Sequence, residues 1–408
     1  MNNNKKDTPH IITGEEYEER IKHLKDFNDV TNFAKELIAP TLQKMLEAEL
    51  DNHLGYQKHE YHGRGTGNSR NGSSTKKLKT SFGQTNLSVP RDRSGTFEPL
   101  VVKKHETMQS DIEERIISMY AKGLTTRDIS NYMQDIYGVE ISAGMISNIT
   151  EKILPLITEW QSRPLESIYP FISLDGIYYK VRDGGRIVNR TAYVVLGTNI
   201  DGYKDILGIW VGESEGSKFW LAILNELKNR GVNEILIASI DGLKGFNDAI
   251  KTIFPETQVQ RCIVHQIRHT MKYVPHKHKK SFAADLKTIY TAPTEEAGLE
   301  AITELKKKWP DYSLYLKSWE DNWPELSPLY QYPAEIKKIM YTTNQIESVN
   351  RQFRKVTKTT SVFPHDEALI KLLWLAQRDI TKKWTSAVHN WGVIISQLAL
   401  IFPEKIKI

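Results

Sequence analysis

The sequence predicts a multidomain α+β protein in which helical segments come first and a mixed α/β region follows. Apolar residues recur at three-to-four spacing over residues 15–54 and again over residues 111–154, the spacing of amphipathic helices. Strand-like stretches then gather between residues 169 and 240, with one helical stretch among them. Residues 264–338 follow with an almost wholly helical pattern rich in Lys and Trp. A chain of 408 residues has room for roughly two to four domains.

The composition favours a cytoplasmic protein without membrane contact. Cys262 is the single cysteine, so an intrachain disulfide cannot form and a reducing compartment is the default expectation. The polar start of the chain lacks the apolar stretch of a signal peptide. No apolar run reaches the roughly 18 residues that a membrane span needs.

Residues 1–55 are predicted to form a helical region that serves packing or dimerisation. Pro40 should divide this region into two helices, because proline lacks the N–H group that a helix interior uses. The apolar positions at helical spacing are Phe33, Leu37, Leu42, Met45, Leu46 and Leu50. A helix face of this kind packs against neighbours or against a second copy. We therefore expect a homodimer or a higher homo-oligomer.

Residues 56–108 carry a concentrated positive charge. Ten Lys and Arg stand against three Asp and Glu between positions 58 and 104, and this excess of seven is larger than the net charge of +5 of the whole chain. Glycines punctuate the first part, and one or two short strands are expected over residues 78–90. A localised basic block indicates a polyanion partner, although a solvated linker has the same composition. The candidate DNA contacts are Arg64, Arg70, Lys76, Lys77, Arg91 and Arg93.

Residues 109–158 are predicted to form a helix-turn-helix. Thr125 is a natural N-cap of its middle helix, and Gly138 is a natural stop. Three short helices in quick succession suit this DNA-binding motif, but a three-helix bundle without a DNA role gives the same pattern. The three helices are expected at residues 111–121, 125–137 and 142–154. The candidate DNA contacts are Arg127, Ser147, Asn148 and Lys152.

The next predicted domain comprises residues 165–265 and 339–385 and is α/β. Three strands come first, and a hairpin at positions 183–185 joins the first two. A helix and a fourth strand follow, which gives the β-β-β-α-β order that begins a ribonuclease H-like core. Asp175 lies in the first strand, and Asp241 directly follows a β-branched apolar run typical of a strand buried on both faces. The end of such a strand is where α/β sheets place their chemistry, although Asp241 could merely cap the next helix.

A helical insertion is expected over residues 266–338, and a helical tail over residues 386–408. Between them a helix near residues 341–355, capped by Thr342 or Thr343, presents Glu347 on a polar face opposite an apolar one. The polar neighbours of this glutamate, as candidate DNA contacts, are Asn350, Arg351, Arg354 and Lys355. A solvated helix with an i,i+4 pair between Glu347 and Arg351 fits the same pattern.

Three carboxylates on separate elements suit a two-metal site. Asp175, Asp241 and Glu347 supply the oxygen ligands that Mg²⁺ prefers, and Mn²⁺ can substitute for it. Two such ions would activate the attacking hydroxyl and stabilise the leaving oxygen, while the nearby arginines hold phosphates. The sequence therefore predicts three metal ligands that are also the catalytic acids.

The sequence resembles the IS256-type transposases, bacterial relatives of the Mutator elements, over nearly its whole length. The matching stretches are Arg70-Asn-Gly72, Val89-Pro-Arg91, Met119-Tyr-Ala-Lys-Gly-Leu124, Thr126-Arg-Asp-Ile129, Arg163-Pro-Leu165, Leu174-Asp-Gly176, Leu207-Gly-Ile-Trp210, Trp220, Arg230-Gly-Val232, Asp241-Gly-Leu-Lys-Gly-Phe246, Gln260-Arg-Cys-Ile-Val-His265 and Thr342-Thr-Asn-Gln-Ile-Glu-Ser-Val-Asn350. The resemblance implies a DDE triad at Asp175, Asp241 and Glu347, in a ribonuclease H-like domain interrupted by a helical insertion.

The resemblance also implies what such a protein does with DNA. The expected partners are double-stranded transposon ends with inverted repeats and the target DNA, in association with the bacterial nucleoid. The expected reaction is Mg²⁺-dependent strand cleavage and strand transfer, by a copying route through circular intermediates. A DNA-binding regulator without catalysis, derived from the same modules, is the alternative, and a structure-specific nuclease with a ribonuclease H-like core is a third possibility.

Cys262 and His265 match a Cys-x-x-His signature of that family. A lone Cys/His pair cannot complete a tetrahedral zinc site, so no structural zinc is expected. Two interpretations stay open for the pair. Cys262 is an auxiliary core residue and His265 merely starts a helix, or His265 takes a catalytic part beside the triad by bonding a carboxylate or a scissile phosphate.

Overall fold

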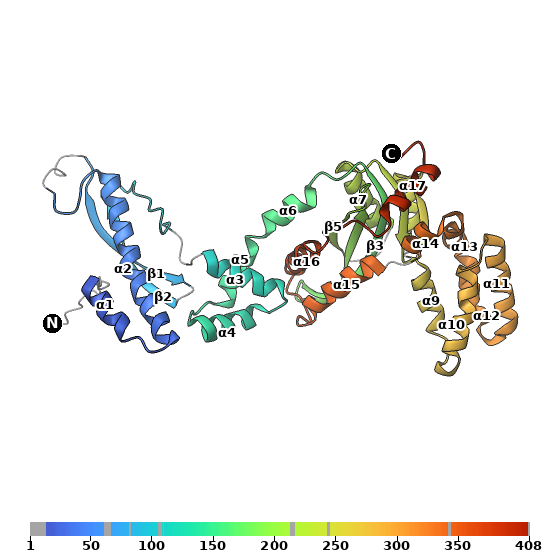
Figure 1. Cartoon of the computed structure of the whole chain (residues 1–408), viewed down its shortest axis with the longest axis horizontal. Coiled ribbons are helices and arrows are strands. Elements are labelled where there is room, and N and C mark those ends of the chain that lie inside the picture. The colour runs from blue at the N-terminus through green and yellow to red at the C-terminus, as the bar shows by residue number, and fades with distance from the viewer. Residues whose placement is uncertain are drawn as a thin grey trace. The chain divides into compact units, whose positions relative to one another are not determined.

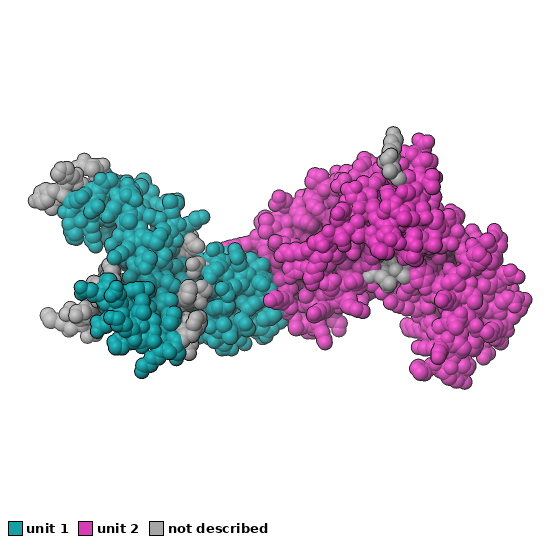
Figure 2. Space-filling view, in the orientation of Figure 1, with its two compact units in different colours: residues 1–120, 124–151 teal, residues 121–123, 152–408 magenta. Residues whose placement is uncertain are grey.

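The computed structural model describes residues 14–60, 67–80, 83–104, 108, 110–212, 217–242, 245–341 and 344–406. The chain forms two compact units, residues 1–120 with 124–151 and residues 121–123 with 152–408 (Figure 2). Helices and two separate sheets make up these units, so the predicted multidomain α+β class is confirmed. The finer division into six segments stays a prediction. Within the described part of the chain, no helix combines the length and apolarity that crossing a bilayer requires.

The first unit begins with α1 (Gly14–Lys22), α2 (Phe27–Leu54) and the antiparallel hairpin of β1 (Arg70–Thr80) and β2 (Gly83–Asp92). The long helix α2 lies against this hairpin (Figure 1). Leu46 of α2 shares a buried apolar cluster with Leu78 and Leu87 of the two strands. The opposite face of the hairpin is polar, so the basic segment presents its charge on a two-stranded ribbon backed by a helix.

The predicted break of the first helical region at Pro40 was wrong, because Pro40 lies inside α2. Asp26 begins the helix by accepting a hydrogen bond from the Asp29 amide at 2.9 Å, and Gly55 ends it in the left-handed conformation. A proline removes one intrahelical hydrogen bond. The helix continues because its apolar face, packed on the hairpin, outweighs the loss of that single bond.

Three short helices complete the first unit: α3 (Ser110–Ala121), α4 (Thr126–Tyr137) and α5 (Ala143–Glu151). Thr125 caps α4 in a reciprocal capping box with Asp128, and Gly138 ends it at φ 60°, which confirms both predicted signals. Their shared core contains Ile116, Ile129, Met133, Ile146 and Ile149. The predicted helix over residues 142–154 was too long. It ends at Glu151, and a separate helix α6 (Leu154–Ser162) begins beside Pro155, since proline fits a first turn.

The second unit is built on a five-stranded sheet with the order β5-β4-β3-β6-β7. Its strands are β3 (Ile168–Asp183), β4 (Arg186–Thr198), β5 (Lys204–Gly212), β6 (Glu234–Ile240) and β7 (Gln258–Arg261), with α7 (Ser217–Asn229) and α8 (Phe246–Ile253) between the later ones. β3, β4 and β5 pair antiparallel, whereas β6 and β7 run parallel to β3. The predicted hairpin is confirmed, with Gly184 and Gly185 both at positive φ in the two-residue turn between β3 and β4.

Helices make up almost all of the remaining chain, as predicted for residues 264–338. They are α9 (Ile263–Met271), α10 (His276–Tyr290), α11 (Glu295–Lys308), α12 (Ser313–Asp321), α13 (Trp323–Leu326), α14 (Ala334–Met340), α15 (Asn344–Thr357), α16 (Asp366–Thr381) and α17 (Trp391–Ile401), with short 3-10 segments at Pro310–Tyr312 and Ser327–Gln331. α10, α11 and α12 pack side by side around Phe282 and Trp319 (Figure 1). Trp391 of α17 meets Phe171 of β3 edge-on, with 6.2 Å between ring centroids.

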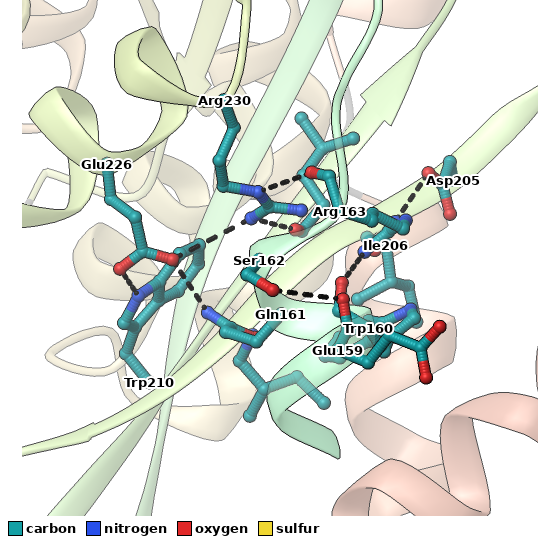
Figure 3. A network of polar contacts seen from close by, with 12 residues as sticks. Glu159, Trp160, Gln161, Ser162, Arg163, Asp205, Ile206, Trp210, Glu226 and Arg230 are labelled. Carbon is teal, nitrogen blue, oxygen red and sulfur yellow. Dashed lines mark hydrogen bonds and ion pairs between the residues drawn. The ribbon is translucent and has the colours of Figure 1, made fainter. Parts of the chain in front are cut away.

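A network of polar groups around the buried Arg230 ties α6 and α7 to β5 (Figure 3). The Arg230 guanidinium donates to the backbone oxygens of Arg163 and Leu207 at 2.9 and 2.7 Å. Glu226 lies 3.8 Å from the same guanidinium and accepts from the Trp210 indole at 2.7 Å. Burial and the neighbouring Arg163 lower the pKa of Arg230 to about 10. The family motifs at positions 163, 210 and 230 therefore contribute to the fold rather than to chemistry.

Replacing Arg230 by methionine should lower the free energy of unfolding by about 3 kcal/mol, because two buried carbonyl groups lose their donor and Glu226 loses its counter-charge. Urea unfolding followed by circular dichroism measures the change. The matched control is Arg186→Met, an exposed arginine at the β3–β4 turn of the same sheet, which should stay within about 0.5 kcal/mol of wild type. Equal stability of the two variants would show that the network adds nothing.

Candidate active site

The register of the parallel strands brings Asp175 and Asp241 to equivalent positions. Ser173 of β3 pairs with Ser239 of β6, and each aspartate comes two residues later on its strand. Asp241 directly follows β6, which is buried along nearly its whole length. The two aspartates therefore reach the same level on adjacent strands, at the carboxyl end of β6.

Asp175 is a largely buried carboxylate, 8% exposed. Its Oδ1 accepts from the Gly176 amide at 2.9 Å, and its Oδ2 accepts from the side-chain amide of Asn350 on α15 at 2.5 Å. Burial raises the pKa of Asp175, while these hydrogen bonds and the charges of His265 and Arg354 oppose the rise. Neutral donors do not balance the negative charge of a buried carboxylate, so a nearby cation would stabilise its ionised form.

Asn350 was predicted to contact DNA from the exposed face of α15, together with the neighbouring basic residues. The structure places it on a buried face instead. Its side chain is 1% exposed and contacts Asp175. The reason is that α15 packs against β3 along a broader face than the apolar residues alone define. A phosphate contact does not suit this buried position, whereas holding Asp175 in one orientation does.

His265 lies in the first turn of α9, which follows β7 directly. The Cys262 amide donates to the Ile240 carbonyl at 2.7 Å and so continues the β6–β7 pairing to the start of the helix. Cys262 is fully buried there. The His265 Nε2 atom lies 3.5 Å from Oε1 of Glu347. The pKa of His265 is raised, first by its hydrogen bond with Cys262 and then by the charges of Asp241 and Asp175.

Glu347 is held by a residue that the sequence patterns did not single out. Arg268 of α9 forms a bidentate ion pair with it, with Nη1–Oε1 and Nη2–Oε2 distances of 2.5 and 3.0 Å. A signal was available in the sequence, since Arg268 follows His265 by three residues and shares its helix face. Asp175, Asp241, Glu347 and His265 are thus brought to one region by β3, β6, α15 and α9.

Comparisons of the amino-acid sequence show which family the chain resembles. The family described as "Transposase, Mutator family" matches residues 12–387. The chain belongs to the Mutator family of transposases. A probable transposase for an ISRM3-like insertion sequence from Sinorhizobium fredii is 42% identical over 366 residues, which are 89% of this chain and 90% of that relative. The ISRM3 transposase of Rhizobium meliloti is 41% identical over the same shares of both chains. The IS256 transposase of transposon Tn4001 from Staphylococcus aureus is 26% identical, over 90% of this chain and 94% of its own.

The three acids of the transposase are of the chemical type that binds a hard divalent cation, but their side chains are not close enough together to hold one. Asp175, Asp241 and Glu347 offer carboxylate oxygens, the ligands of Mg²⁺ and Mn²⁺. Among the described residues, however, no three His, Cys, Asp or Glu side chains stand close enough together to hold a metal ion. Both oxygens of Glu347 are occupied by Arg268. A metal would therefore bind with a movement of that pair.

Three of the predicted DNA contacts of the second unit lie on α15. Arg351, Arg354 and Lys355 are exposed there, one to two turns after Glu347. Their exposure leaves them accessible to a polyanion, and their role as DNA contacts stays a prediction. Lys152 is exposed just before α6. Thr342 and Thr343, the predicted caps of α15, lie outside the described residues.

The predicted DNA contacts of the first unit fall into two groups. Arg70 is paired with Asp51 and lies over the Tyr56 ring, and Lys76 donates to the Lys103 and Lys104 carbonyls, so both are engaged within the unit. The exposed group consists of Lys77, Arg91, Arg93, Arg127 and Asn148. Ser147 is half-buried, and Arg64 lies outside the described residues. The exposed group is the part of the prediction that a polyanion can reach.

The burial of Asp175 predicts a pH-dependent cost in stability. The pKa of Asp175 in the folded protein lies above its ordinary value of 3.8, so folding favours the protonated form. The cost is complete above the raised pKa and disappears as pH falls through it towards 3.8. Without divalent ions, Asp175→Asn should therefore melt above wild type at pH 7, and the difference should shrink in acid.

Thermal unfolding across this pH range measures the effect. Asp201→Asn, in the exposed turn between β4 and β5, is the matched control and should show no such trend. A Tm of Asp175→Asn at or below that of wild type at neutral pH would contradict the burial argument.

Proposed function

We propose that this protein is a DDE transposase with a ribonuclease H-like catalytic domain. It binds the terminal inverted repeats of its element and carries out Mg²⁺-dependent strand cleavage and strand transfer. The observation that carries the proposal is the matched register of Asp175 and Asp241 on adjacent strands, together with the 3.5 Å distance between Glu347 and His265 of the helix that follows β7. The chain order of β3, β4, β5, α7 and β6, with the first three strands antiparallel, supports such a core, because it follows the predicted β-β-β-α-β order. Relatives named as insertion-sequence transposases support the same activity.

In this proposal Asp175, Asp241 and Glu347 would hold two divalent ions, Mg²⁺ or Mn²⁺. When bound, such ions activate an attacking water or 3′-hydroxyl and stabilise the leaving oxygen. Asn350 fixes the orientation of Asp175 by donating to Oδ2. The His265 imidazole lies next to Glu347, and its raised pKa favours the protonated form, which suits a phosphate oxygen. Arg351 and Arg354 are exposed on α15 to hold the scissile strand.

In the first unit the proposed task is DNA-end recognition. Exposed basic side chains lie on the β1–β2 ribbon and on α4, and α3 to α5 have the lengths and caps of a helix-turn-helix. Phosphate contacts supply most of the affinity in such complexes. A synaptic complex needs two ends, which accords with the proposed homodimer or higher oligomer.

A non-catalytic regulator derived from a transposase is the second candidate. The observation that favours it is the bidentate pair of Arg268 with Glu347, which withholds one acid from metal. The regulator and the enzyme would bind the same DNA ends. Only the enzyme would nick and join them when Mg²⁺ is added.

Amide substitution of the acids separates binding from chemistry. Asp175→Asn, Asp241→Asn and Glu347→Gln should each abolish cleavage of labelled inverted-repeat DNA in Mg²⁺. End binding should stay nearly intact, because affinity comes mainly from phosphate contacts elsewhere. Gel analysis of nicked and joined products, beside a binding titration of each variant, gives both readouts. Near-normal strand transfer by one variant would remove that residue from the triad.

The affinity of the full-length protein for its DNA ends should fall steeply with salt. Removing Lys77 and Arg91 together, as alanines, should weaken binding and reduce the slope of log K against log salt by roughly one per side chain. Fluorescence anisotropy at several salt concentrations measures this slope. Lys44→Ala, an exposed lysine of α2, is the control within the same unit. An unchanged slope in the double variant would place the DNA on another surface.

A further inference from the structure

We propose that Arg268 is a built-in substitute for the metal at Glu347, so that the guanidinium and a divalent cation compete for this carboxylate. Arg268 would then lower the affinity of Glu347 for a divalent cation. The inference rests on the proposed function, because it takes Glu347 as a metal ligand. It concerns a positioning residue that acts through Glu347.

The contact geometry supports competition rather than coexistence. Each terminal nitrogen of Arg268 faces a different oxygen of Glu347, at 2.5 and 3.0 Å. A fork of this kind engages both carboxylate oxygens, the atoms with which Glu347 would hold a metal ion. A second side chain, the His265 imidazole, lies with its Nε2 atom 3.5 Å from Oε1. A divalent ion cannot join Glu347 until the Arg268 fork swings away.

The exposure of the two partners makes that movement feasible. The Arg268 side chain is 57% exposed and that of Glu347 is 22% exposed. Ion pairs at such positions are weakly stabilising, since water competes for both groups. Arg268 leaves α9 on a long stem, so it can turn aside without disturbing the helix. The released guanidinium then lies beside the acids, ready for a phosphate oxygen of the DNA.

Asp175 shows the contrasting arrangement. Its oxygens accept hydrogen bonds from the uncharged amides of Gly176 and Asn350. No positively charged side chain therefore competes with a metal ion through these two contacts. Arg354 acts on Asp175 only through its charge and makes no described contact with Glu347. Arg354 therefore supplies a matched control, because removing it takes away a nearby positive charge without breaking the fork.

Mn²⁺ titration of the full-length protein without DNA, followed by electron paramagnetic resonance, tests the inference. Arg268→Gln should bind Mn²⁺ roughly three- to fivefold more tightly than wild type. Arg354→Gln should gain clearly less. In a Glu347→Gln background, Arg268→Gln should bring no further gain, because the carboxylate it guards is absent. Arg268→Lys, which keeps the charge but loses the fork, should lie between wild type and Arg268→Gln.

Circular dichroism confirms the fold of each variant, and Arg268→Lys carries the test if Arg268→Gln fails to fold. Unchanged or weaker Mn²⁺ binding by folded Arg268→Gln overturns the inference. An equal gain from Arg354→Gln, or a persistent gain without the Glu347 carboxylate, overturns it as well. Failure of the proposed function would look different: wild type would leave inverted-repeat DNA uncut, whatever the titrations show.

Discussion

The parallel pairing of β3 with β6, and of β6 with β7, is the constraint on which the candidate site depends. Because side chains alternate along a strand, a shift of one residue in the β3–β6 register would turn Asp175 away from Asp241. The Cys262 amide, bonded to Ile240, carries the same pairing into α9 and so fixes where His265 begins its turn. The apolar residues buried along β6 hold this register, and they make a slip costly.

Burial gives Asp175 and Glu347 different electrostatic surroundings. Asp175 is enclosed and receives neutral donors, so its negative charge is left uncompensated by any contact the structure describes within hydrogen-bonding distance. Glu347 is more exposed and is already neutralised by Arg268. In the proposed metal site, Asp175 would therefore offer an uncompensated charge to a cation, whereas Glu347 would first have to give up its ion pair. This contrast follows from the different burial of the two carboxylates.

Local patterns predicted the strands, the hairpin at Gly184 and Gly185, the Thr125 cap and the placement of Asp175 and Asp241, because each depends on neighbours in sequence. The contact of Asn350 with Asp175 spans 175 residues, and that of Arg268 with Glu347 spans 79. Tertiary packing decides which helix faces meet when residues are so far apart in the sequence. Local sequence patterns therefore could not predict these two contacts. The predicted helix break at Pro40 was wrong for the same reason, since packing of α2 on the hairpin outweighed the tendency of proline to interrupt a helix.

The Arg163 and Arg230 network shows why motifs of a transposase family need not mark chemistry. Arg230 is buried and its donors go to backbone oxygens of segments distant in sequence, so it joins α7 to α6 and β5 from within. Its partner Glu226 also receives Trp210, which couples an aromatic side chain of the sheet to the same charge. The network thus joins β5 to the helices α6 and α7. A residue in a family motif can therefore serve the fold through its hydrogen bonds alone.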